Sequence, residues 1–113
     1  KVAVASSKNQ PMLEMGLRDN NLIGVLDTYA GRIDEAATDK ITAIAHVMRQ
    51  LGFDASESVM IGDRRFDMEA AFPNKIPCIG VLYGKTTNKQ ELIDAGAVAI
   101  VDTVEDLHHV LLA

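Results

Sequence analysis

The sequence predicts an α/β fold built on a doubly wound parallel sheet, with helices on both faces of the sheet. Short, mostly apolar runs of four to six residues alternate with longer segments that carry helix signals. The apolar runs lack the two-residue alternation of strands that expose one face to water, so both faces should be covered. Crossover segments of this length are typical of parallel β-α-β units.

Five apolar runs are predicted to be strands, at residues 2–5, 23–26, 58–61, 76–81 and 98–101. The carboxyl ends of parallel strands meet at one edge of a sheet, and the loops at that edge usually carry the chemistry. The loops after these runs hold most of the hydroxyl side chains and several of the carboxylates of the chain.

Helix signals lie between the predicted strands. Pro11 stands where the first turn of a helix tolerates proline. Apolar residues recur at helical spacing from Ile41 to Leu51, and Gly52 provides the stop. The remaining predicted helices are residues 66–72, 90–95 and 104–112, and Asp34-Glu35 is predicted to be a solvent-exposed turn.

Length and composition indicate one globular domain over residues 1–113, because 48% of the residues are hydrophobic and 24% are charged. The net charge of −5 argues against nucleic-acid and anionic-membrane partners. A single cysteine, Cys78, excludes an internal disulfide framework and is expected to be a core thiol. No apolar run approaches the roughly 20 residues of a membrane span, and we expect a cytoplasmic protein.

The stretch from Gly62 to Asp67 is the most informative part of the sequence. Asp63 ends an apolar strand, and Asp67 follows four residues later in the first turn of a predicted helix. Two carboxylates placed in this way suit Mg²⁺, which usually takes one or two protein carboxylates and keeps water or phosphate as its other ligands. The alternative is that Asp63 caps the helix and Asp67 complements its dipole.

Two further features point to an anion. Ser6 and Ser7 follow the first predicted strand, where hydroxyls and backbone N–H groups at a helix start form an anion site. The alternative is an ordinary helix cap made by a Ser or by Asn9. Lys40 opens the amphipathic helix and is either a tolerated surface cation or a phosphate ligand. The neighbouring Arg64-Arg65 pair is expected to be solvated.

Taken together, Ser6, Lys40 and the Gly62–Asp67 stretch resemble, in order and spacing, the second, third and fourth motifs of the haloacid dehalogenase-like phosphatase superfamily. The surrounding sequence is most similar to the phosphoglycolate phosphatase-like branch, and the resemblance covers essentially the whole chain. It implies a Rossmann-like core of about five strands and a hydrolase that forms an aspartyl-phosphate from a small phosphorylated metabolite.

The resemblance also implies a role for each residue. Ser6 would bind the transferring phosphoryl group, helped by the backbone N–H of Ser7, and Lys40 would hold the phosphate. Asp63 would ligate Mg²⁺, and Asp67 would be a second or outer-shell ligand. Such a clamp is what phosphoryl transfer requires.

The sequence departs from this family in one respect. The first motif, an Asp-x-Asp pair that contains the nucleophile, occurs nowhere in the 113 residues. Asp27 follows an apolar run, but Tyr29 stands at the acid–base position, so we do not assign Asp27 as the nucleophile. The chain also opens on Lys1 and runs directly into a strand. We therefore expect the C-terminal part of a longer enzyme, whose central first-motif strand and cap lie in a missing N-terminal segment.

Two alternatives remain open at the level of the sequence. The chain is either part of such a phosphatase or a non-catalytic binding or regulatory module that keeps the scaffold without the nucleophile. Within the enzyme class, a sugar phosphomutase or a nucleotidase of the same superfamily is a further alternative. Without the nucleophile, the 113 residues alone are predicted to be inactive.

Overall fold

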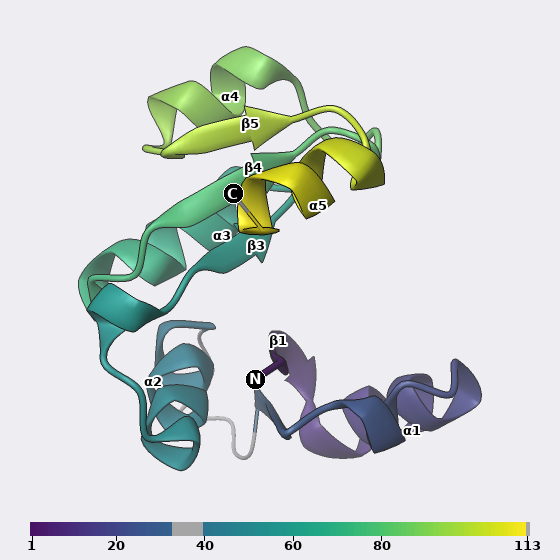
Figure 1. Cartoon of the computed structure of the whole chain (residues 1–113). Coiled ribbons are helices and arrows are strands. Elements are labelled where there is room, and N and C mark those ends of the chain that lie inside the picture. Colours follow the sequence, from purple (N-terminus) through teal and green to yellow (C-terminus); the bar gives the residue numbers. More distant parts are fainter. Residues whose placement is uncertain (33–39, 113) are drawn as a thin grey trace. The chain divides into compact units, whose positions relative to one another are not determined.

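The computed structural model describes residues 1–32 and 40–112, so the turn predicted at Asp34-Glu35 lies outside the described part of the chain. The chain divides into two compact units, Lys1–Asp54 and Ala55–Ala113, and each is described by itself (Figure 1).

In its described residues, the first unit contains two parallel strands and two longer helices. Their bounds are β1 Ala3–Asn9, α1 Gln10–Asp19, β2 Thr28–Arg32 and α2 Lys40–Leu51. The helix predicted around 41–51 is confirmed, and the first predicted strand is confirmed but continues four residues further, to Asn9.

The prediction of a strand at residues 23–26 is wrong. Ile23–Val25 forms a short 3₁₀ turn, and the side chain of Val25 is 68% exposed. The second strand begins two residues after the predicted run ends, at Thr28, and its buried residues are Ala30 and Gly31. Asp27 therefore precedes a strand, and its Oδ2 accepts a hydrogen bond of 2.7 Å from the Val2 N–H. This places Asp27 at the amino ends of the strands, away from the edge where the chemistry was predicted.

Small side chains fill the contact between α2 and the strands of the first unit. Ala30 of β2 packs with Ala43 and Val47 of α2, and the half-buried Ala3 and Ala5 of β1 join this cluster. Because these side chains are short, α2 can lie close to the sheet. On α1 the buried residues are Leu13 and Leu17, and this helix also packs against β1 and β2.

The second unit is a three-stranded parallel sheet in the order β3-β4-β5, with three helices. Its elements are β3 Met60–Gly62, α3 Arg65–Ala71, β4 Cys78–Val81, α4 Lys89–Asp94, β5 Ala99–Val101 and α5 Val104–Leu112. The three strands and three helices predicted here from the sequence are all present, with ends shifted by a few residues.

The alternation along β4 separates the helices onto two faces of this sheet. On one face, a Cβ added to Gly80 would lie only 2.7 Å from Cδ1 of Leu92, so α4 packs directly on the strand there. On the other face, Ile79 and Val81 form a cluster with Val101, against which Leu107 of α5 packs. All strand pairs in the described residues are parallel. The doubly wound α/β class predicted from the sequence is thereby confirmed.

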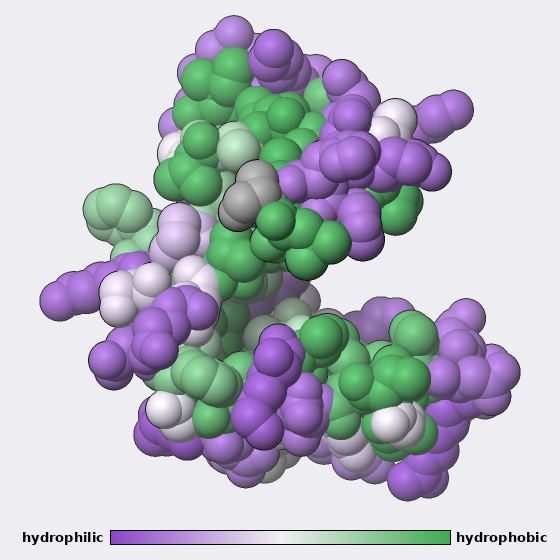
Figure 2. Space-filling model, viewed as in Figure 1, coloured by the Kyte–Doolittle hydropathy of each residue, from purple (hydrophilic) through white to green (hydrophobic). Residues whose placement is uncertain are grey.

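Apolar side chains also reach the surface of both units (Figure 2). Val2, Met15 and Val25 are exposed in the first unit, and Leu112 is exposed in the second. None of the helices within residues 1–32 and 40–112 combines the length and the hydropathy that spanning a bilayer requires.

Candidate functional site

Asp63 lies at the carboxyl end of β3, immediately after Gly62, and its side chain is half-buried. The loop that follows the neighbouring strand β4 reaches it. The Thr86 hydroxyl lies 3.0 Å from Oδ2 of Asp63 and 3.1 Å from its main-chain oxygen. The Asp63 carboxylate thus lies among the loops at the carboxyl ends of the strands, as the sequence predicts.

Asp67 is tied to the same loop. Its side chain is only 5% exposed, and its Oδ2 accepts hydrogen bonds from the backbone N–H groups of Asp63, at 3.1 Å, and Arg64, at 3.2 Å. Arg64 is the N-cap of α3, so the cap position does not belong to Asp63. Asp67 therefore fixes the backbone that presents Asp63 and at the same time satisfies N–H groups at the helix start.

Gly62 makes this arrangement possible. A Cβ added to Gly62 would lie 2.2 Å from Cβ of Asp67 and 2.5 Å from its Oδ2. Any side chain at this position would displace the Asp67 carboxylate or the start of α3. Glycine thus stands before Asp63 for a steric reason, because the Asp67 side chain leaves no room for a Cβ at residue 62.

Next to Asp63, two guanidinium groups lie over one exposed aromatic ring. The Cζ atoms of Arg64 and Arg65 are 5.3 Å and 5.0 Å from the centroid of the Phe66 ring. All three side chains are exposed, in agreement with the prediction that the two arginines are solvated.

In the first unit, Ser6 and Ser7 lie on an irregular part of β1. Ala5 pairs with Ala30 but Asn9 pairs with Arg32, so β1 carries two extra residues in this interval. Bulges of this kind re-aim side chains and are frequent next to functional sites. The sequence predicted a loop here, whereas the structure continues the strand through both serines.

The alternative interpretation, a Ser or Asn helix cap, is confirmed for Asn9 and not for Ser6. Its Oγ accepts a hydrogen bond of 3.1 Å from the Lys8 N–H. The cap of α1 is Asn9, whose Oδ1 accepts from the Met12 N–H at 2.9 Å. With capping assigned to Asn9, the hydroxyls of the two serines are not needed to begin the helix.

Lys40 is the first residue of α2, and its side chain is half-buried. The structure thus places three of the predicted residues, Ser6, Ser7 and Lys40, in the first unit. Asp63 and Asp67 lie together in the second unit, joined through the Asp63 N–H.

Asp63 and Asp67 are suited to bind a cation that takes few ligands from the protein. No group of three or more His, Cys, Asp or Glu side chains is arranged to hold a metal in the described ranges. Mg²⁺ commonly takes only one or two carboxylates and completes its shell with water and phosphate oxygens. Asp63 fits the direct ligand, and Asp67, whose Oδ2 accepts two backbone N–H groups, fits a supporting role.

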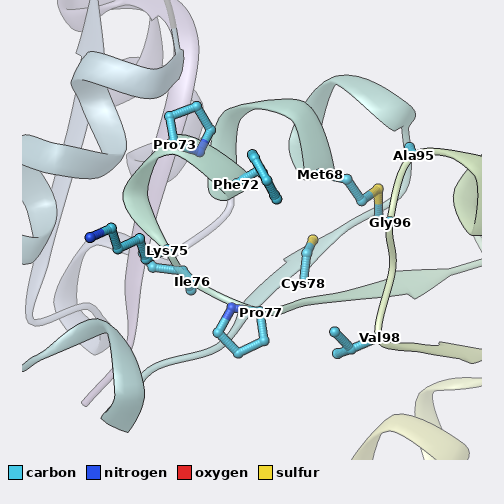
Figure 3. A pocket seen from close by; sticks show the side chains of 10 residues that line it. All are labelled: Met68, Phe72, Pro73, Lys75, Ile76, Pro77, Cys78, Ala95, Gly96 and Val98. Atoms are coloured by element: carbon cyan, nitrogen blue, oxygen red, sulfur yellow. The ribbon is translucent and has the colours of Figure 1, made fainter.

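An apolar cavity of about 690 Å³ lies elsewhere in the second unit (Figure 3). Ile76, Pro77 and Cys78 line it at the amino end of β4, and Val98 lines it just before β5. Asp63 and Thr86 follow the carboxyl ends of β3 and β4, so the cavity lies at the opposite edge of the sheet. Cys78 is buried, as predicted.

Comparison with known proteins places these features in a family. The family model for haloacid dehalogenase-like hydrolases matches residues 1–81. A 5'-nucleotidase of Pseudomonas aeruginosa is 39% identical over 56 residues, which are 50% of this chain and 25% of that protein.

Two solved structures cover nearly the whole chain. A predicted phosphatase from Clostridium acetobutylicum has 34% sequence identity and a TM-score of 0.90, over 97% of this chain and 51% of that one. A protein provisionally described as a phosphoglycolate phosphatase, from Lactobacillus delbrueckii subsp. bulgaricus, has 26% identity and a TM-score of 0.85, over 98% of this chain and 46% of that one. The chain therefore spans about half the length of these two structures.

Proposed function

Because this chain belongs to the haloacid dehalogenase-like hydrolases, we propose that the whole protein is a Mg²⁺-dependent phosphomonoester hydrolase. Its substrate would be a small phosphorylated metabolite, in the manner of a phosphoglycolate phosphatase. The single observation that carries the proposal is the position of Asp63, a half-buried carboxylate at the end of β3 whose backbone is fixed by Asp67. The similarity to solved structures described as phosphatases supports the reaction class.

In this proposal the predicted residues divide into a metal-binding group and a phosphate-binding group. Asp63 would hold Mg²⁺, which when bound supplies positive charge against the phosphate oxygens. Asp67 would hold the loop that carries Asp63. Ser6, the N–H of Ser7 and Lys40 would bind and orient the phosphoryl group. Electrostatic stabilisation and positioning of this kind account for most of the catalysis of phosphoryl transfer.

The phosphoryl acceptor would come from a segment outside these 113 residues. We propose an N-terminal strand that ends in Asp-x-Asp, whose first Asp forms the aspartyl-phosphate and whose second acts as acid and base. The described strands support this proposal, because they divide into β1-β2 and β3-β4-β5. In each sheet the edge strand, β1 or β3, has one side without a strand partner among the described residues, and a further strand would pair there. A cytoplasmic location belongs to the same proposal.

The test is a phosphatase panel on the full-length protein. Phosphate release would be measured with and without MgCl₂ on phosphoglycolate, sugar phosphates and nucleoside monophosphates. The nucleotides are included because of the similarity to a 5'-nucleotidase. Mg²⁺-dependent turnover of one class supports the proposal. If the gene upstream of Lys1 encodes no Asp-x-Asp and no substrate is hydrolysed, the non-catalytic module is the better description.

Replacing Ser6 by Ala in the full-length protein is expected to lower kcat/KM moderately. One hydrogen bond to a charged group is worth about 1.5–3 kcal/mol, which corresponds to roughly 10- to 150-fold. Steady-state kinetics on the best panel substrate would measure the loss. Ser56→Ala is a suitable control, because this exposed serine precedes β3 at the amino end of the sheet. An unchanged kcat/KM in Ser6→Ala would show that Ser6 does not bind the phosphoryl group.

The 113 residues expressed alone are expected to release no phosphate from any panel substrate. Ser6, Lys40 and Asp63 bind charge in the proposed mechanism, but none of them accepts the phosphoryl group. Hydrolysis without the acceptor would depend on direct attack by water, without an acid–base residue at the leaving group. Phosphate release would be compared with that of the full-length protein at equal concentration, and turnover at a similar rate would contradict the proposed mechanism.

A further inference from the structure

We propose that Thr86 is a positioning residue that fixes the Asp63 carboxylate in the orientation needed to bind the cation. This inference rests on the proposed function, since it gives Asp63 the role of a Mg²⁺ ligand. Thr86 lies 23 residues beyond Asp63 in the sequence, in the loop between β4 and α4. No motif in the sequence connects the two residues.

The contact between the two side chains has hydrogen-bond geometry. The Thr86 hydroxyl lies 3.0 Å from Oδ2 of Asp63 and 3.1 Å from the main-chain oxygen of the same residue. A hydroxyl has one proton to donate, and a bond to a charged carboxylate is stronger than one to a neutral carbonyl. With Oδ2 engaged in this way, Oδ1 is the carboxylate oxygen that takes no hydrogen bond among the described residues.

The backbone of the same loop also passes close to the Asp63 side chain. A Cβ added to Gly84 would lie 3.3 Å from Oδ2 of Asp63, so a side chain at this position would crowd the carboxylate. Lys85 follows in the left-handed region, with φ of 58°, and its N–H donates to the Leu82 oxygen at 3.1 Å. This tight turn brings Thr86 back toward β3.

A hydrogen bond to one oxygen of a ligating carboxylate restricts the direction of the other. Mg²⁺ requires a nearly ideal octahedral shell and tolerates little variation in the position of its ligands. Partners that orient metal ligands typically change metal affinity or activity by 10- to 100-fold when they are removed. Thr86 stands in this relation to Asp63, because its hydroxyl donates a hydrogen bond of 3.0 Å to Oδ2 of the proposed ligand.

Mg²⁺ binding to the full-length protein, without substrate, tests the inference. Isothermal titration with MgCl₂, and the rise in Tm that MgCl₂ causes, would be measured for Thr86→Ala and Thr86→Ser. Thr87→Ala is the matched control, because the Thr87 hydroxyl lies 3.4 Å from the Asn88 oxygen, whereas the hydrogen bonds to Asp63 come from Thr86. We expect 10- to 100-fold weaker Mg²⁺ binding in Thr86→Ala, near-normal binding in Thr86→Ser and no change in Thr87→Ala.

The serine variant separates positioning from packing, because it keeps the hydroxyl and removes only a methyl group. Equal losses in Thr86→Ala and Thr86→Ser would overturn the inference, as would normal Mg²⁺ binding in Thr86→Ala. A full-length protein that binds no Mg²⁺ would overturn it too. A protein that binds Mg²⁺ in this Thr86-dependent manner but hydrolyses no panel substrate would contradict the proposed function and leave the role of Thr86 supported.

Discussion

Replacing Asp63 by Asn in the full-length protein is expected to reduce Mg²⁺-dependent hydrolysis by about 100-fold or more, since a direct ligand should matter at least as much as an outer partner. The neutral amide nearly preserves the shape of the side chain but is a poorer ligand for a hard cation. Initial rates at increasing MgCl₂ would measure the effect. A large part of the loss should appear as a higher Mg²⁺ concentration at half-maximal rate.

Asp102→Asn is the matched control for this experiment. Asp102 also follows a strand, β5, at the same edge of the sheet, and its side chain is exposed. Its replacement removes one negative charge without touching the Asp63 loop. If both variants lost activity equally, the effect would be one of overall charge, and an active Asp63→Asn enzyme would show that the metal lies elsewhere.

The largest effect on stability is expected for Gly62→Ala. The new Cβ would lie 2.2 Å from Cβ of Asp67, an atom held directly by the backbone of α3. Overpacking a well-filled site usually costs about 1–3 kcal/mol, and a contact this short should be at the upper end of that range or beyond. Urea unfolding of the full-length protein would show a lower midpoint, and Mg²⁺ binding should weaken in parallel.

Gly16→Ala is the matched control, because a Cβ at this position causes no clash. A Cβ at Gly16 meets no atom within 4 Å, and the residue lies inside α1. Alanine is about 1 kcal/mol better than glycine in a helix interior, so this variant should be as stable as the parent or more so. A Gly62→Ala protein as stable as Gly16→Ala would show that α3 can shift without cost.

The fold could be predicted from the sequence where a strand coincides with a run of apolar residues. The strands β4 and β5 were located in this way. The method failed at β2, whose buried residues are Ala30 and Gly31, too small to stand out as an apolar run. The nearby Ile23–Val25 segment had the stronger apolar signal, yet it forms a 3₁₀ turn with Val25 exposed. A short apolar run does not by itself distinguish a strand from a turn.

The candidate site was predictable to the extent that its residues are close in the sequence. Asp63 and Asp67 lie four residues apart at a strand-to-helix junction, and local geometry brings them together. Thr86 was missed because its contact with Asp63 depends on the register of β3 with β4, in which Gly62 pairs with Gly80. Pairing between strands of different segments is a tertiary property, and a threonine in a loop gives no signal of it.

The hydrogen bonds to Asp67 also make two backbone amide protons useful for measuring how often the Asp63 loop opens. The N–H groups of Asp63 and Arg64 donate to one oxygen of the buried Asp67, so their exchange with solvent is slowed while Asp67 stays in place. Their exchange rates therefore measure how often the Asp63 loop opens, independently of whether any reaction takes place. Deuterium uptake over this short stretch therefore measures the rigidity of the site at single residues.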